Sequence, residues 1–84
     1  MTQIDKLFAR LQQTRRGKYA ELQHLLLACG FRLVRQRGSH QSWRHDASGE
    51  GLTIQPNGKE AMDYQIREFL RIVREQDLKP GAEA

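Results

Sequence analysis

With 84 residues the chain has room for one hydrophobic core, and 38% apolar against 29% charged residues excludes a disordered chain, so we expect a single domain over residues 1–84. The longest apolar run, residues 25–29, is too short to cross a membrane, and the lone Cys29 has no partner for a disulfide or a zinc finger. Fourteen Lys and Arg against ten Asp and Glu leave a formal charge of +4, which favours an anionic partner only weakly.

Two amphipathic helices are predicted in the N-terminal third of the chain. Apolar residues recur with helical spacing between residues 4 and 11, after Thr2, which is placed to cap the first helix. Gly17 is expected to end that helix by adopting a positive φ. The same spacing predicts a second helix over residues 18–29, with Gly30 as its C-terminal capping residue.

From residue 31 the period of the pattern becomes two, which predicts a strand over residues 31–37. Strict alternation places Phe31, Leu33 and Arg35 on one face and the residues between them on the other, and neither face is clearly apolar. Gly38 and Ser39 then form a tight break before the next alternating segment.

Residues 40–45 and 52–55 are predicted to form the second and third strands, separated by a turn of small and polar residues. Alternation along the second strand makes Trp43 face the core. It also places His40 and His45 on opposite faces, because they are five residues apart. The third strand stops at Pro56.

Asp63 is placed to cap a last amphipathic helix, and residues 78–84 are expected to form a flexible tail. Two helices, three antiparallel strands and one helix make an α+β fold of the order α-α-β-β-β-α. The helices are expected to pack on one face of the sheet, which leaves its other face free to bind a ligand.

A single histidine lies among basic residues where the first two strands meet. Because histidine titrates near physiological pH, His40 can transfer protons in a cleavage for which RNA supplies its own 2′ hydroxyl as nucleophile. Backbone amides, a hydroxyl and guanidinium groups nearby can hold the phosphate. The RNA-binding candidates are Gly38, Ser39, Arg35, Arg37, Arg44 and Lys59. No metal site is expected, because the histidines and Asp46 have no recognised ligand spacing.

The segment from residue 30 to about residue 75 resembles the HicA family of toxins. The resemblance rests on a series of motifs that follow one another at the separations expected for the family. In order they are GF, an arginine-rich strand, GSH, an aromatic strand, TIQP and YQIREFL. On this reading residues 18–76 form the HicA-like core, and residues 1–16 form an N-terminal helical extension.

The resemblance implies a fold like that of a double-stranded-RNA-binding domain and a toxin of a type II toxin-antitoxin system. A cytoplasmic location is expected because the sequence shows neither a membrane span nor the pattern of a signal peptide. It further implies an mRNA interferase, an endoribonuclease that needs no metal or cofactor, with His40 as general acid/base. Its partners would be mRNA and a HicB-type antitoxin, with which it would form a hetero-oligomer. Many family members carry a histidine just after the proline of the third strand, whereas Asn57 follows Pro56 here. The alternative is a non-catalytic RNA- or protein-binding module of the same fold.

Overall fold

Three helices lie on one side of a small antiparallel sheet in the computed structural model, which describes residues 2–81. In chain order the elements are α1 (Gln3–Thr14), α2 (Tyr19–Ala28), β1 (Phe31–Arg37), β2 (His40–His45), β3 (Glu50–Ile54), β4 (Pro56–Asn57), β5 (Glu60–Ala61) and α3 (Asp63–Gln76). The predicted α+β class and the order of its helices and three main strands are confirmed. Among residues 2–81, no helix is long and apolar enough to cross a membrane.

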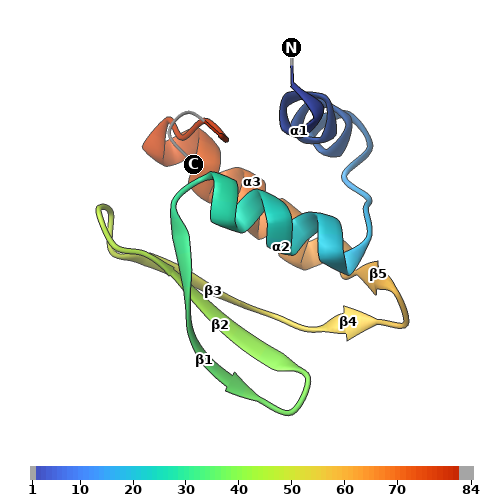
Figure 1. Ribbon diagram of the computed structural model, residues 1–84, viewed down its shortest axis with the longest axis vertical. Helices are drawn as coiled ribbons and strands as arrows, with labels where there is room; N and C mark the ends of the chain where they lie inside the picture. Colours follow the sequence, from blue (N-terminus) through green and yellow to red (C-terminus); the bar gives the residue numbers. More distant parts are fainter. Residues whose placement is uncertain (1, 82–84) are drawn as a thin grey trace.

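The main sheet has the strand order β1-β2-β3, with antiparallel neighbours, and β4 and β5 form a separate two-stranded hairpin. Helix α2 packs against β1, and α3 packs against β3. Helix α1 lies over the two other helices, so the molecule has the sheet on one side and helices on the other (Figure 1). The opposite face of the sheet is uncovered.

The hydrophobic core lies between the sheet and the helices. Trp43 points into it with 5% of its surface exposed, as its place in the alternation predicts. Phe69 of α3 is fully buried, and its ring lies 6.1 Å from that of Phe31 and 6.5 Å from that of Phe8. Leu11 is also fully buried, so α1 contributes to the same core as the sheet and the other helices.

The end of α1 differs from the prediction. Arg15, not Gly17, adopts the left-handed conformation, with a φ of 55°, and its N–H donates to the carbonyl of Leu11 at 2.8 Å. Gly17 has a different role, because a Cβ there would lie 2.7 Å from Cδ1 of Leu11. The glycine lets the chain pass close to the buried leucine. At the other end of the helix, Thr2 is the N-cap, as predicted.

Helix α2 begins and ends within one residue of its predicted bounds, and α3 begins within one residue of its predicted start. Helix α2 spans Tyr19–Ala28, flanked by Lys18 and Cys29 as its cap residues, and Gly30 follows with a φ of +92°, as expected. The N-cap of α3 is Met62 rather than Asp63. Asp63 lies in the first turn of the helix instead, where its carboxylate interacts favourably with the helix dipole.

The β4–β5 hairpin, which the sequence analysis did not predict, ties the third strand to the start of α2. The N–H of Ala61 donates to the carbonyl of Gly17, and the N–H of Tyr19 donates to the carbonyl of Lys59, both at 2.9 Å. The chain after α3 also packs back, because the N–H of Gly81 donates to the carbonyl of Ala28 at 2.8 Å. The predicted flexible tail, residues 78–84, therefore contacts α2 at Gly81, and residues 82–84 lie outside the described residues.

Candidate active site

One irregularity in β1 decides which side chains share a face of the sheet. Leu33 lies opposite Trp43, but the next paired residue is Arg35, which lies opposite Ser42. Val34 is therefore an extra residue in the strand, a β-bulge, after which the alternation resumes one residue later. Arg35 consequently lies on the face opposite to Leu33, and the prediction that they share a face was wrong.

The face of the sheet turned away from the helices collects the polar side chains of β1 and β2. Residues directly opposite each other in antiparallel strands lie on the same side of a sheet, which makes the pairs adjacent on this surface. The three pairs are Arg32 with Arg44, Arg35 with Ser42, and Arg37 with His40. These six residues are here called the outward face. All are exposed except Ser42, which is half-buried beside Thr53, with their hydroxyl oxygens 3.3 Å apart.

His40 begins β2 directly after the two-residue turn of Gly38 and Ser39. Gly38 has a φ of +56° while Ser39 does not have a positive φ, which is the pattern of a type II′ hairpin turn. The side-chain amide of Gln36 braces this turn by donating to the carbonyl of Gly38 at 3.2 Å. The His40 side chain is exposed, and within residues 2–81 no hydrogen bond of its ring to another side chain is found. The turn thus presents an imidazole at the end of the sheet.

The arginines of the outward face are not equally free to bind an anion. Nε and Nη2 of Arg32 donate to the two carboxylate oxygens of Asp46 at 3.0 and 3.1 Å. This pairing lowers the pKa of the Asp46 carboxyl and raises the pKa of Arg32. Among the described residues, Arg35, Arg37 and Arg44 form no ion pair. Their guanidinium groups can therefore bind phosphates, bidentately where the geometry fits.

A shallow pocket of about 480 Å³ lies between the two strands on this face. This pocket is lined by Arg32, Val34 at the bulge, Arg35, Ser42 and Arg44. Arg32 and Ser42 were not among the predicted RNA-binding residues. Alternation from His40 could have identified Ser42, whereas the tie between Arg32 and Asp46 depends on the fold.

Two other residues named in the sequence analysis, His45 and Lys59, do not lie on the outward face. His45 is buried on the core side, where its Nδ1 lies 2.8 Å from the hydroxyl of Ser48 and its ring packs 5.3 Å from that of Phe31. It therefore lies opposite to His40, as predicted. Lys59 lies in the β4–β5 turn, next to the start of α2 and away from the β1–β2 turn (Figure 1). In residues 2–81 no cluster of three metal-ligating side chains occurs.

From α2 onwards the main elements follow the order α-β-β-β-α, as in a double-stranded-RNA-binding domain, and the uncovered face carries one histidine among arginines. These features define a small α+β protein with a basic, ligand-accessible sheet. A family model described as HicA toxin of bacterial toxin-antitoxin matches residues 19–74, which is more than half of the chain. The chain belongs to the HicA toxin family and is thus a toxin of a toxin-antitoxin system. No curated protein and no solved structure matches it.

The match begins at the first residue of α2 and ends within α3. Helix α1 and residues 75–81 lie outside it. The outward face lies entirely inside it.

Proposed function

We propose that this toxin is a metal-independent endoribonuclease that cleaves mRNA, with His40 as general acid/base. The observation that carries the proposal is the direct pairing of His40 with Arg37 on the outward face. Side chains directly opposite each other have Cβ atoms about 4.5–5.5 Å apart, so one phosphodiester can contact both the imidazole and the guanidinium. Arg35 and Arg44 extend the positive surface along the same face.

The reaction needs only the RNA and these side chains. The 2′ hydroxyl of the substrate attacks the adjacent phosphorus and loses its proton, while the bond to the 5′ oxygen breaks and that oxygen gains a proton. Neutral His40 accepts the first proton, or protonated His40 donates the second, and water exchanges the other. The products are a 2′,3′-cyclic phosphate and a 5′ hydroxyl. Because charge accumulates on the phosphate oxygens in the transition state, Arg37 stabilises it.

Gly38 and Ser39 are proposed to position the phosphate. Gly38 has no side chain and nothing lies within 4 Å of the place where a Cβ would be, so a nucleotide can approach the backbone of the turn. The hydroxyl of Ser39 can donate to a phosphate oxygen. Lys59 lies in the separate β4–β5 turn and is proposed as an outer contact for the RNA chain.

We further propose that a HicB-type antitoxin neutralises the toxin by covering the outward face. An acidic protein surface placed there would pair with the free arginines and exclude RNA from His40 at the same time. The complex would be a hetero-oligomer.

The test uses the purified toxin, separated from its antitoxin, and an end-labelled mRNA in the presence of EDTA. We expect cleavage that leaves cyclic phosphate ends, and a single 2′-deoxy nucleotide at the cut should abolish cleavage there. His40→Ala should lower the rate by about 10²–10⁴-fold. His24→Ala is the matched control, because His24 is also exposed but lies on α2, away from the outward face. Equal cleavage by wild type and His40→Ala would refute the proposal.

A non-catalytic RNA-binding module would give a different pattern. Wild type would bind the RNA without cutting it, and His40→Ala would arrest growth on induced expression as strongly as wild type does. Neutralising Arg35 and Arg44 would abolish that effect.

A further inference from the structure

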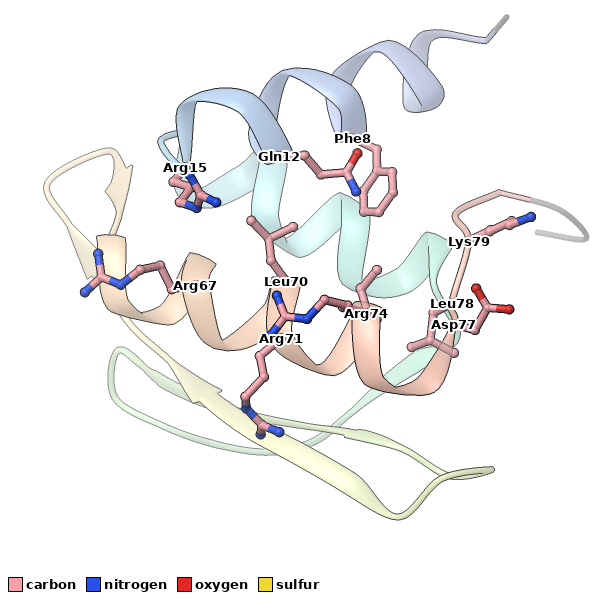
Figure 2. A pocket seen from close by; sticks show the side chains of 11 residues that line it. Phe8, Gln12, Arg15, Arg67, Leu70, Arg71, Arg74, Asp77, Leu78 and Lys79 are labelled. Atoms are coloured by element: carbon pink, nitrogen blue, oxygen red, sulfur yellow. The ribbon is translucent and has the colours of Figure 1, made fainter.

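A second basic surface lies between α1 and α3, on the helical side of the molecule. It is a groove of about 650 Å³, within the size range of clefts that hold ligands. Figure 2 shows Phe8 reaching from α1 toward α3, with Leu70 and Arg74 below it and Arg15 and Arg67 at one end. The α1–α3 groove is defined here by Phe8, Arg15, Arg67, Leu70, Arg74 and Leu78.

The rim of the groove carries positive charge that the protein itself does not neutralise. Arg15, Arg67, Arg74 and Lys79 line it, and no ion pair to any of them is found within residues 2–81. Asp77 is the one carboxylate among the residues lining it. An anion entering the groove would thus meet an excess of cations.

Arg71 also borders the groove but does not contribute to this charge. Its guanidinium donates to Glu68 and to Glu75, each at 2.6 Å, and lies 3.8 Å from Glu50 of β3. In Figure 2 its side chain points toward the sheet rather than toward α1. Arg67 and Arg74 on the same helix form no such ion pairs within the described residues, so their charges are available to a ligand.

The C-terminal ends of two helices border the groove. Arg15 is the C-cap of α1 and Asp77 is the C-cap of α3, and both adopt the left-handed conformation that commonly ends a helix. Both residues line the groove, so the side chain of Arg15 adds a cation at the end of α1.

The floor of the groove is apolar. Phe8, Leu70 and Leu78 pack against the core but stay partly exposed. A nucleic acid strand would match the charge of the rim and could stack a base on Phe8, but it has no aliphatic groups to cover Leu70 and Leu78. A protein segment with apolar residues on one side and carboxylates on the other would match both the floor and the rim.

We propose that the α1–α3 groove binds an acidic, amphipathic protein segment. Its apolar side chains cover Phe8, Leu70 and Leu78, and its carboxylates pair with Arg15, Arg67 and Arg74. Because α1 lies outside the matched region, this site belongs to the present chain rather than to the HicA core. It does not depend on whether His40 cleaves RNA, because the groove and the outward face lie on opposite sides of the core.

The test measures binding of a fluorescent peptide of about four helical turns, with leucines at helical spacing and glutamates elsewhere. We expect saturable binding to the full chain. A scrambled peptide of the same composition, and a peptide with lysine in place of glutamate, should bind about tenfold more weakly or worse. Equal binding of the scrambled peptide would overturn the proposal, because it would show attraction between net charges alone.

Variants then locate the site. Arg67→Glu with Arg74→Glu should weaken peptide binding by about tenfold or more, whereas Arg35→Glu with Arg44→Glu should leave it unchanged. Arg15→Gly should also weaken binding, and unfolding cannot explain that loss because glycine favours the backbone conformation at this position. RNA cleavage should survive the groove variants. If they reduce affinity for an oligouridine instead of the peptide, the groove binds RNA and the proposal is wrong.

Discussion

Arg37 lies directly opposite His40 at the closed end of the β1–β2 hairpin, separated from it along the chain only by Gly38 and Ser39. A two-residue turn holds the register of a hairpin tightly, so the guanidinium and the imidazole are kept on one face without help from the core. This pairing places a fixed positive charge beside the proposed proton carrier.

Replacing Arg37 should therefore affect catalysis more than folding. We expect Arg37→Gln to lower kcat/KM for RNA cleavage by about 10- to 100-fold, because the transition state loses a charged partner. The thermal midpoint should change little, because Arg37 is exposed and unpaired. Arg16→Gln removes an equally exposed arginine from the connection between α1 and α2 and should cleave like wild type. Equal losses in both variants would indicate a general charge effect.

Deleting a residue from β1 tests the bulge. Removal of Val34 should leave Arg35 opposite Ser42 and Leu33 opposite Trp43, since the strand then alternates regularly. We expect the folded state and most of the RNA affinity to survive. Removal of Gln36 should be much more harmful, because it turns Arg37 toward the core side. Cross-strand proton contacts measured by NMR report the register of each variant. A folded Gln36 deletion with wild-type cleavage would contradict the assignment of faces.

Gly17 should be sensitive even to alanine. The added Cβ would meet Cδ1 of Leu11 at 2.7 Å, so Gly17→Ala should destabilise the protein by about 1–3 kcal/mol in urea unfolding. Leu11→Ala leaves a cavity and should cost about 2–5 kcal/mol. Because the second change removes the atom that clashes, the double variant should be more stable than the sum of the two effects predicts. Additive effects would show that Gly17 is needed for another reason.

Cys29 should resist alkylation in the folded protein. Burial raises the pKa of its thiol to about 12, whereas an unfolded cysteine ionises near pH 8.5. At pH 8.5 we expect iodoacetamide to react on the order of a thousandfold more slowly with the native chain than with the urea-unfolded chain. The unfolded state releases this proton first, so stability should fall as the pH rises above about 9 toward 12. Cys29→Ala should remove that component of the pH dependence. Rapid labelling of the native thiol would contradict its burial.

The sequence by itself determined the features that follow from local periodicity. Helical spacing of apolar residues located three helices to within one or two residues, and alternation placed Trp43 in the core and His40 on the opposite face. The motifs GF, GSH, TIQP and YQIREFL, in this order and at the separations found in the family, were enough to indicate the HicA family. Each of these signals depends on neighbouring residues in the chain, which is why they can be read without a fold.

The tertiary structure alone decided that Arg35 shares a face with His40 and that Arg32 is held by Asp46. Valine is common in strands with or without a bulge, so the sequence does not show that Val34 is an extra residue in β1. Only the pairing of β1 with β2 shows that Arg35 lies on the face opposite to Leu33. The α1–α3 groove likewise depends on packing between segments far apart in the sequence. Contacts between distant segments leave no local pattern in the sequence. In this toxin, such contacts decide which guanidinium groups form ion pairs and which stay free.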